Sequence, residues 1–145
     1  MAEDLLATLE AERRIRRLIA RYGEAVALKD AELARDLFAE DAEVTIADKP
    51  VRVGREAIVA GFANALSAFR WLHQKSDSGL IDVAGEAANA RYQVVEFNES
   101  LADGVVAMIT GTYDDSYVQR GGTWYFHRRR FTLRAHAVIG KAQNR

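Results

Sequence analysis

The sequence predicts an α+β fold, in which helices of the N-terminal half pack against a curved antiparallel or mixed sheet formed mainly by the C-terminal half. The strongest observation is a long hairpin from Val105 to His136, where two runs rich in Val, Ile, Thr, Tyr, Phe and Trp flank Gly121-Gly122. Arms of roughly 45 Å, at ~3.3 Å per residue, are expected to bend because sheets twist. The second observation is helical periodicity upstream, which supplies apolar faces able to fill the concave side of such a sheet.

Composition limits the classes of protein to consider. A chain of 145 residues is long enough for one domain with a real core, so residues 1–145 are expected to form a single domain. The net charge of −1 provides no overall field to attract nucleic acid or an acidic membrane. Cysteine is absent, which excludes disulfides and thiolate chemistry. The N-terminus is acidic and no apolar run approaches the ~18 residues of a membrane span, so we expect a cytoplasmic protein without membrane or nucleic-acid partners.

Three helices are expected in the first half of the chain. Residues 5–28 carry one apolar stripe at helical spacing, formed by Ile15, Leu18, Ile19, Tyr22 and Val26. Asp30 can cap a second helix over residues 31–38. Gly54 then breaks a strand before the third helix, residues 55–69. These helices are expected to bury their apolar faces against the sheet.

The remaining chain predicts strands. Residues 42–47 and 51–53 flank the turn Asp48-Lys49-Pro50. Beyond the third helix the pattern indicates strands only, over residues 71–83 and 86–99 and then along both arms of the hairpin. Helices first and strands afterwards is the order typical of α+β proteins.

Alternation along the strands indicates which side chains face the interior. Between Ala88 and Asn98 the even positions are mostly apolar, so Tyr92, Glu96 and Asn98 are expected to face inward. A buried unpaired carboxylate is costly. Glu96 is therefore either half of a structural ion pair with an arginine or part of a functional site.

Other candidates leave two interpretations open. His73, in the segment WLHQK, is either a core-edge histidine or a general acid or base. Tyr22 is either a packed aromatic or a hydrogen-bond donor to a ligand. Asp114 and Asp115 are adjacent, so only one of them is expected to point inward.

The last strand has no clean apolar face, since one side carries Tyr125, His127, Arg129, Phe131 and Leu133 and the other carries four polar residues and two aromatics. One of its faces is either part of the pocket, with His127 as a polar group, or a subunit interface. The histidines show no HxH or HExxH spacing, and the chain has neither a glycine-rich phosphate loop nor a GxSxG elbow. Chemistry without a metal or cofactor is therefore expected.

Three segments resemble a known family. Residues 21–44 read RYGEAVALKDAELARDLFAEDAEV, residues 54–62 read GREAIVAGF and residues 111–131 read GTYDDSYVQRGGTWYFHRRRF. In order and spacing they resemble SnoaL-like and ketosteroid-isomerase-like proteins of the nuclear transport factor two superfamily. The resemblance implies a cystatin-like cone, in which a curved sheet wraps three helices around a deep apolar pocket, and it implies a homodimer.

The resemblance also implies roles for single residues, although the match is incomplete. Tyr22 and Asp114 match the tyrosine and the protonated aspartic acid of the isomerase oxyanion hole. The isomerase base, however, falls on Ile46. His73 matches the histidine of scytalone dehydratase and of bile-acid dehydratases, whereas their helix-one aspartate falls on Ala27. The bile-acid enzymes carry a carboxylate in the region of Glu96, and a second histidine of scytalone dehydratase falls near Asn98.

Two functions are compatible with these residues. The first is a cofactor-independent acid–base enzyme of the dehydratase, isomerase or cyclase type, acting on a small, mostly apolar oxygenated ring compound. Its catalytic residues would be His73, Glu96, Tyr22 and Asp114, and its ligand-binding residues would be Asn98, His127, Phe131, Phe62 and Tyr92. The second is a non-catalytic module that binds a small apolar or aromatic ligand or serves dimerisation, as in the small subunits of ring-hydroxylating dioxygenases.

Overall fold

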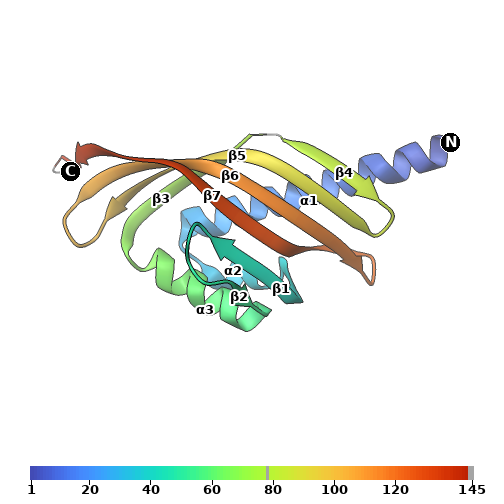
Figure 1. Cartoon of the computed structure of the whole chain (residues 1–145), viewed down its shortest axis with the longest axis horizontal. Coiled ribbons are helices and arrows are strands. Elements are labelled where there is room, and N and C mark those ends of the chain that lie inside the picture. Colours follow the sequence, from blue (N-terminus) through green and yellow to red (C-terminus); the bar gives the residue numbers. More distant parts are fainter. Residues whose placement is uncertain (78, 144–145) are drawn as a thin grey trace.

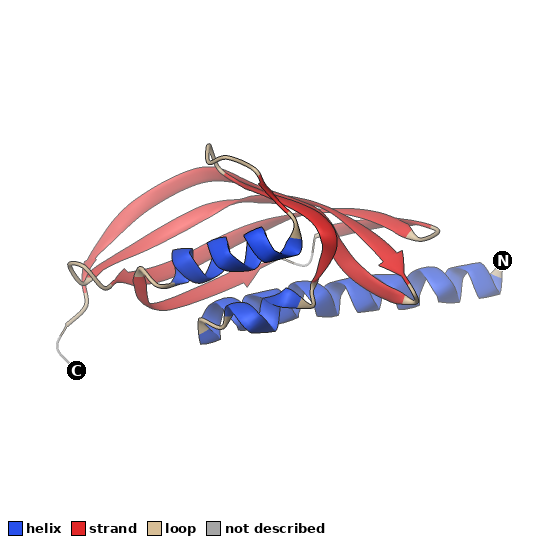
Figure 2. Cartoon of the chain, turned by 90° about the horizontal axis from the view of Figure 1, so that it is seen from below, coloured by secondary structure: helices blue, strands red, loops and turns tan. Residues whose placement is uncertain are grey.

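The computed structural model describes residues 1–77 and 79–143 and confirms the α+β fold (Figure 1). Its helices are α1 (Ala2–Leu28), α2 (Ala31–Arg35) and α3 (Arg55–Leu66). Its strands are β1 (Phe38–Ile46), β2 (Arg52–Val53), β3 (Phe69–Ser76), β4 (Leu80–Ala84), β5 (Ala87–Ser100), β6 (Val105–Arg120) and β7 (Thr123–Lys141). The helices lie against the concave side of a curved, unclosed sheet (Figure 2).

The sheet is mixed, with the strand order β2-β1-β7-β6-β5-β3 and with β4 also paired to β5. Strand β1 runs parallel to β7, and the other pairs are antiparallel. The predicted hairpin is present, and both Gly121 and Gly122 have positive φ, 57° and 79°. Such values suit a primed turn, which matches the twist of the two strands.

The N-terminal helices form where the sequence predicts them. Helix α1 buries one stripe, which includes Ile15, Leu18 and Tyr22, and it stops at Lys29, a residue in the left-handed conformation (φ 55°). The Asp30 carboxylate then caps α2 by accepting from the backbone N–H groups of Glu32 and Leu33, at 3.0 and 3.3 Å.

Helix α2 is shorter than predicted. It ends at Arg35 rather than at Phe38, because the chain already pairs with β7 at this point: the backbone N–H of Phe126 donates to the carbonyl of Leu37 at 2.8 Å, and Phe38 is in register with Phe126. The third helix also ends early, at Leu66, and Phe69 begins β3. The predicted strand over residues 71–83 is two strands, β3 and β4, which pair with different parts of β5.

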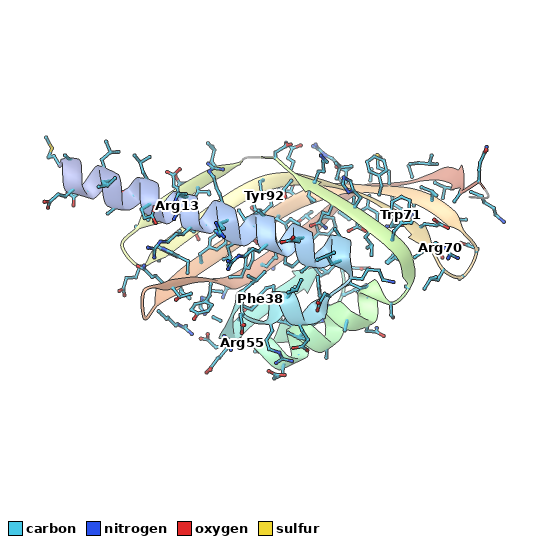
Figure 3. The ribbon with its side chains drawn as sticks, turned by 180° about the vertical axis from the view of Figure 1, so that it is seen from behind. Arg13, Phe38, Arg55, Arg70, Trp71 and Tyr92 are labelled. Carbon is cyan, nitrogen blue, oxygen red and sulfur yellow. The ribbon has the colours of Figure 1, made fainter. Side chains whose placement is uncertain are left out.

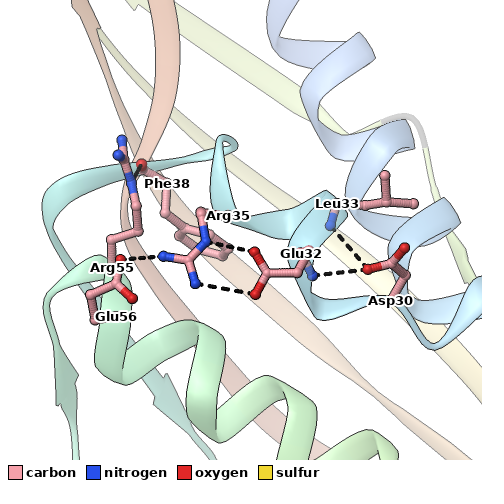
Figure 4. A network of polar contacts seen from close by, with 7 residues as sticks. All are labelled: Asp30, Glu32, Leu33, Arg35, Phe38, Arg55 and Glu56. Carbon is pink, nitrogen blue, oxygen red and sulfur yellow. Dashed lines mark hydrogen bonds and ion pairs between the residues drawn. The ribbon is translucent and has the colours of Figure 1, made fainter.

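A polar network fixes α3 relative to α2 (Figure 4). The Arg35 guanidinium contacts the carboxylates of both Glu32 and Glu56, the second of which lies on α3. At the start of α3, Arg55 Nε donates to the backbone carbonyl of Phe38 at 2.9 Å. Exposed ion pairs of this kind each contribute at most about 1 kcal/mol, so the network orients α3 more than it stabilises the fold.

At the β3 edge of the sheet, Glu99 is buried and accepts hydrogen bonds from Arg70 and Trp71, two side chains of β3 that Figure 3 labels. Trp71 Nε1 donates to its Oε2 at 2.6 Å, and Arg70 Nε donates to its Oε1 at 3.1 Å. This carboxylate is therefore satisfied and structural. In the described part of the chain, no helix is long and apolar enough to cross a membrane.

Candidate functional site

A cavity of about 230 Å³ lies between the helices and the concave face of the sheet. Its wall is mostly hydrocarbon, with side chains from α1 and α3 and from strands β1, β2, β3, β5, β6 and β7. An engineered apolar cavity of ~150 Å³ holds benzene. The cavity is therefore large enough for one substituted ring or two small fused rings.

One carboxylate, that of Glu96, lines this apolar cavity. Two neutral amides hold it in place: Gln74 Nε2 donates to Oε2 at 3.1 Å, and Asn98 Nδ2 donates to Oε1 at 3.0 Å. Glu96 takes part in none of the ion pairs formed by residues 1–77 and 79–143. The predicted alternative, a structural ion pair with an arginine, is therefore wrong. A carboxylate held by amides and free of a counter-ion can accept a proton from a bound molecule.

Two tyrosines face the same cavity as Glu96. The rings of Tyr22 and Tyr113 meet edge to face with centroids 6.2 Å apart, and Gln74 Nε2 lies 3.5 Å from the Tyr113 hydroxyl. Burial raises the pKa of Tyr22, against the opposing effect of nearby Arg129, and burial raises the pKa of Tyr113 well above its ordinary value. Both hydroxyls therefore stay protonated at neutral pH and can donate hydrogen bonds.

Arg129 lies behind the two tyrosines with only 1% of its surface exposed. Its guanidinium carbon is 4.0 Å from the ring centroid of Tyr22 and 3.7 Å from that of Tyr113, which is close cation–π contact. Its Nε lies 3.1 Å from Asp115 Oδ1, and its Nη2 donates to the Tyr92 hydroxyl. Within the described residues its Nη1 has no hydrogen-bond partner.

Asp115 completes this buried network. Its Oδ2 accepts from the hydroxyls of Tyr92 and Tyr117, both at 2.8 Å. Burial by itself would lower the pKa of Arg129, but Asp115 and the neighbouring tyrosines raise the pKa of Arg129 well above its ordinary value. The pair is therefore a fixed charged support behind the cavity wall.

The structure places four of the predicted site residues at the cavity: Tyr22, Glu96, Phe62 and Phe131. Asn98 does not line it but holds Glu96 from behind. Tyr92 also lies behind the wall, where its hydroxyl joins the Asp115 network. The catalytic or binding roles of all these residues stay predictions.

Three predicted site residues do not face the cavity. His73 is exposed on the outer face of β3, because its neighbours Leu72 and Gln74 take the two inward positions. Asp114 is on the outer face of β6, with its carboxylate 3.6 Å from Arg91 Nε, and the inward residue is Asp115. The expectation that His73 and Asp114 point into the pocket is therefore wrong.

His127 is the third. Its ring lies 3.4 Å from the Asp41 carboxylate, outside the cavity, and Asp41 also binds Arg120 through two hydrogen bonds. This exposed cluster joins β1 to the hairpin. Its position shows that His127 does not supply a polar group to the pocket.

Sequence reasoning missed several polar residues at or behind the cavity. Gln74 and Tyr113 could have been found by alternation, because Leu72 and Asp115 occupy the same faces two residues away. Lys49 and Arg52, which line the cavity near the β1–β2 turn, carry no signal that separates them from other exposed cations. In the described part of the chain, no three histidine, aspartate or glutamate side chains converge as metal ligands.

Comparison with known proteins identifies the family. Residues 7–130 match the model of the SnoaL-like domain, so the chain belongs to the SnoaL-like family. A search of curated proteins finds no match. Among solved structures, a scytalone dehydratase candidate from Novosphingobium aromaticivorans DSM 12444 has 25% identity and a TM-score of 0.83, covering 100% of this chain and 94% of that chain.

Two further structures show the same fold. A hexachlorocyclohexane dehydrochlorinase, LinA-type3 from Novosphingobium barchaimii LL02, is 16% identical with a TM-score of 0.85, covering 92% of this chain and 93% of that chain. An NTF2-like protein with a cystatin-like fold from Novosphingobium aromaticivorans DSM is 27% identical with a TM-score of 0.73, covering 91% and 87%. The fold class is therefore the one that the sequence predicted.

Proposed function

We propose that this protein is a cofactor-independent acid–base enzyme, a lyase or isomerase, that acts on a small oxygenated ring compound with Glu96 as the base. The observation that carries the proposal is the Glu96 carboxylate, which Gln74 and Asn98 hold in a mostly hydrocarbon-lined cavity and which has no ion-pair partner among the described residues. A carboxylate fixed in such a cavity is positioned to act as a general base on a bound molecule. The similarity to a dehydratase candidate and a dehydrochlorinase supports this class of reaction.

The proposed chemistry begins with the transfer of a proton from a ring carbon next to a carbonyl to the Glu96 carboxylate. The electron pair of the C–H bond moves to the carbonyl oxygen, and the hydroxyls of Tyr22 and Tyr113 donate hydrogen bonds to the resulting oxyanion. The electron pair then moves back from the oxyanion. In an isomerisation it shifts through a neighbouring C=C bond and a second carbon takes the proton from Glu96. In a dehydration it forms a new C=C bond while the C–O bond of a hydroxyl on the next carbon breaks, and Glu96 gives that hydroxyl the proton, so that water leaves. Neither route needs a metal or an oxidant.

A probe that requires only a base can test this role before the substrate is known. 5-Nitrobenzisoxazole is a two-ring molecule whose C–H proton passes to a carboxylate while its N–O bond breaks, giving a coloured cyanonitrophenolate. Positioned general-base catalysis is worth ~10²–10⁴-fold. We expect Glu96→Gln to lower kcat/KM for this probe by at least 10²-fold, whereas Asp114→Asn, an outer-face carboxylate, leaves it unchanged. A Glu96→Gln variant with wild-type turnover would refute the assignment.

A second function, ligand binding without turnover, is favoured by one observation. No histidine lines the cavity within the described residues, and Gln74 takes the inward position beside His73. A glutamine can hold Glu96 or a ligand but cannot transfer protons near neutral pH. If the protein is such a module, small molecules will bind with Glu96-dependent affinity, and mass spectrometry will recover them unchanged after prolonged incubation.

We further propose that the protein is a cytoplasmic homodimer. Exposed apolar side chains on the C-terminal part of β7, Leu133, Val138 and Ile139, are 47%, 64% and 60% exposed and supply a surface for a second copy. Sedimentation equilibrium should give twice the mass of the chain, 16.1 kDa. A monomer at high micromolar concentration would contradict this part of the proposal.

A further inference from the structure

Two cations line the end of the cavity that is formed by β2 and the turn before it. Lys49 is exposed and Arg52 is half-buried, so the cavity opens to solvent at this end. Neither side chain takes part in an ion pair or a hydrogen bond among the contacts found in the described residues. The nearest acid along the β1–β2 ladder, Glu43, is already engaged, since Arg128 Nε lies 3.4 Å from its carboxylate.

The carboxylate lies toward the other edge of the sheet. In the order β2-β1-β7-β6-β5-β3, Arg52 belongs to the first strand, whereas Glu96 and Gln74 belong to the last two. The cavity therefore has two cations at its mouth, on the β2 side, and a carboxylate toward the β5 and β3 side, with hydrocarbon side chains between them. A neutral apolar ligand would form no ion pair with the two cations at the mouth.

We propose that the cavity binds a ring compound carrying an anionic group, such as a carboxylate, which Arg52 holds at the mouth with Lys49 beside it. This inference rests on the proposed function, because it sets the direction of the substrate: the anionic end faces the mouth, and the reactive C–H or hydroxyl faces Glu96. A guanidinium suits this task, since it can donate two parallel hydrogen bonds to a carboxylate. Repulsion by Glu96 disfavours the reversed orientation.

Gly61 on α3 creates the space that Arg52 occupies. A Cβ at Gly61 would overlap the Nε and Cζ atoms of Arg52, so the guanidinium lies directly against the helix at this residue. The overlap involves only the far end of a flexible side chain and no backbone atom. Gly61→Ala therefore moves Arg52 while retaining its charge and preserving the fold.

The test compares three probes of one shape: cinnamate, cinnamamide and the ammonium form of cinnamylamine. Their affinities are measured by titration calorimetry with the full chain at pH 7 and low salt. We expect cinnamate to bind about tenfold more tightly than cinnamamide, because hydrogen bonds between charged groups survive partial exposure. Equal affinities of these two probes, preference for the ammonium, or no measurable binding of cinnamate would each overturn the proposal.

Variants locate the effect. Arg52→Gln and Gly61→Ala should each reduce the preference for cinnamate to threefold or less while leaving cinnamamide affinity unchanged. Lys75→Gln, which removes an exposed cation of β3 outside the cavity, should retain the full preference. Preference that persists in both Arg52→Gln and Gly61→Ala would show that the anion binds elsewhere.

The two proposals fail in different measurements. If wild-type protein prefers cinnamate but Glu96→Gln still converts 5-nitrobenzisoxazole at the wild-type rate, the anion site stands and the proposed function fails. If Glu96→Gln is inactive on that neutral probe but cinnamate and cinnamamide bind equally, the base is correct and the anion site is wrong.

Discussion

Asp114 and Asp115 are adjacent in sequence, yet their surroundings differ in almost every respect. Asp114 is on the outer face, where its carboxylate makes a long, exposed contact with Arg91. Asp115 is fully buried and accepts hydrogen bonds from Arg129, Tyr92 and Tyr117. Its burial is tolerated because these donors together replace the water that a carboxylate loses on folding.

This contrast predicts very different costs for the same chemical change. Asp115→Asn should lower the free energy of unfolding by about 3–5 kcal/mol, because it leaves the Arg129 guanidinium buried without a counter-charge. Asp114→Asn should change it by less than about 1 kcal/mol, since an exposed pair contributes little. Urea denaturation followed by circular dichroism measures both. Similar values for the two variants would show that Asp115 is not the inward residue.

At the scale of the element, a bulge in β7 explains why the sequence of this strand shows no clean apolar face. The register against β6 shifts between Ser116 and Tyr117, which pair with Arg128 and Phe126, so His127 is an extra residue in the strand. A β-bulge of this kind reverses the alternation of side chains. Trp124 and Phe126 face the core before the bulge, and Arg129 and Phe131 face it afterwards.

The sequence predicted most of the elements, but not the ends of α2 and α3, the division of residues 71–83 into two strands, or the facing of several side chains. The apolar stripe of α1, the Asp30 cap and the Gly121-Gly122 turn depend on local chemistry, and all three are present. The grouping of His127 with Arg129 assumed uninterrupted alternation along β7, which the bulge breaks. Asp114 was chosen from the resemblance, whereas the unbroken alternation of β6 gives the inward position to Asp115. No local sequence pattern indicates this bulge, because it depends on the register in which two strands pair.

A second shift in the β6–β7 register, beside Gly111, predicts a sensitive position in the cavity wall. A Cβ at Gly111 would collide with the backbone carbonyl of Thr132 and with the ring of Phe131, which lines the cavity. Gly111→Ala should therefore destabilise the fold by about 1–3 kcal/mol, as overpacking does. Gly23→Ala is the matched control: a Cβ there meets nothing within 4 Å, and alanine favours α1 by ~0.5–1 kcal/mol. Thermal denaturation should move the two midpoints in opposite directions.

For the whole molecule, the site depends on pairings that no single segment determines. Glu96, Gln74 and Tyr22 converge only because β5 pairs with β3 and because α1 crosses the concave face of the sheet. Alternation placed Glu96 on the inward face, and the helical stripe placed Tyr22 there, to which the resemblance added a role in an oxyanion hole. Gln74 was not among the predicted site residues, although alternation from Leu72 gives the inward position of β3 to Gln74 and not to His73.

The tyrosine-rich core makes the stability of the whole molecule sensitive to alkaline pH. Burial raises the pKa of Tyr22, Tyr92, Tyr113 and Tyr117 in the folded protein. Below the ordinary tyrosine pKa of ~10 both folded and unfolded chains hold these protons, so stability does not depend on them. Above it the unfolded chain releases protons that the folded chain retains, and linkage then lowers the free energy of unfolding as pH rises.

Each such tyrosine should contribute a loss of ~1.4 kcal/mol per pH unit above ~10 until its folded form ionises. Urea titrations between about pH 8 and pH 11 should give a flat region followed by a steep decline, and Tyr117→Phe should make the decline shallower by about one such contribution. Tyrosinate absorbance from these four residues should appear together with the loss of helical circular dichroism. Ionisation of all the tyrosines in a chain that is still folded would show that the aromatic core is open to water.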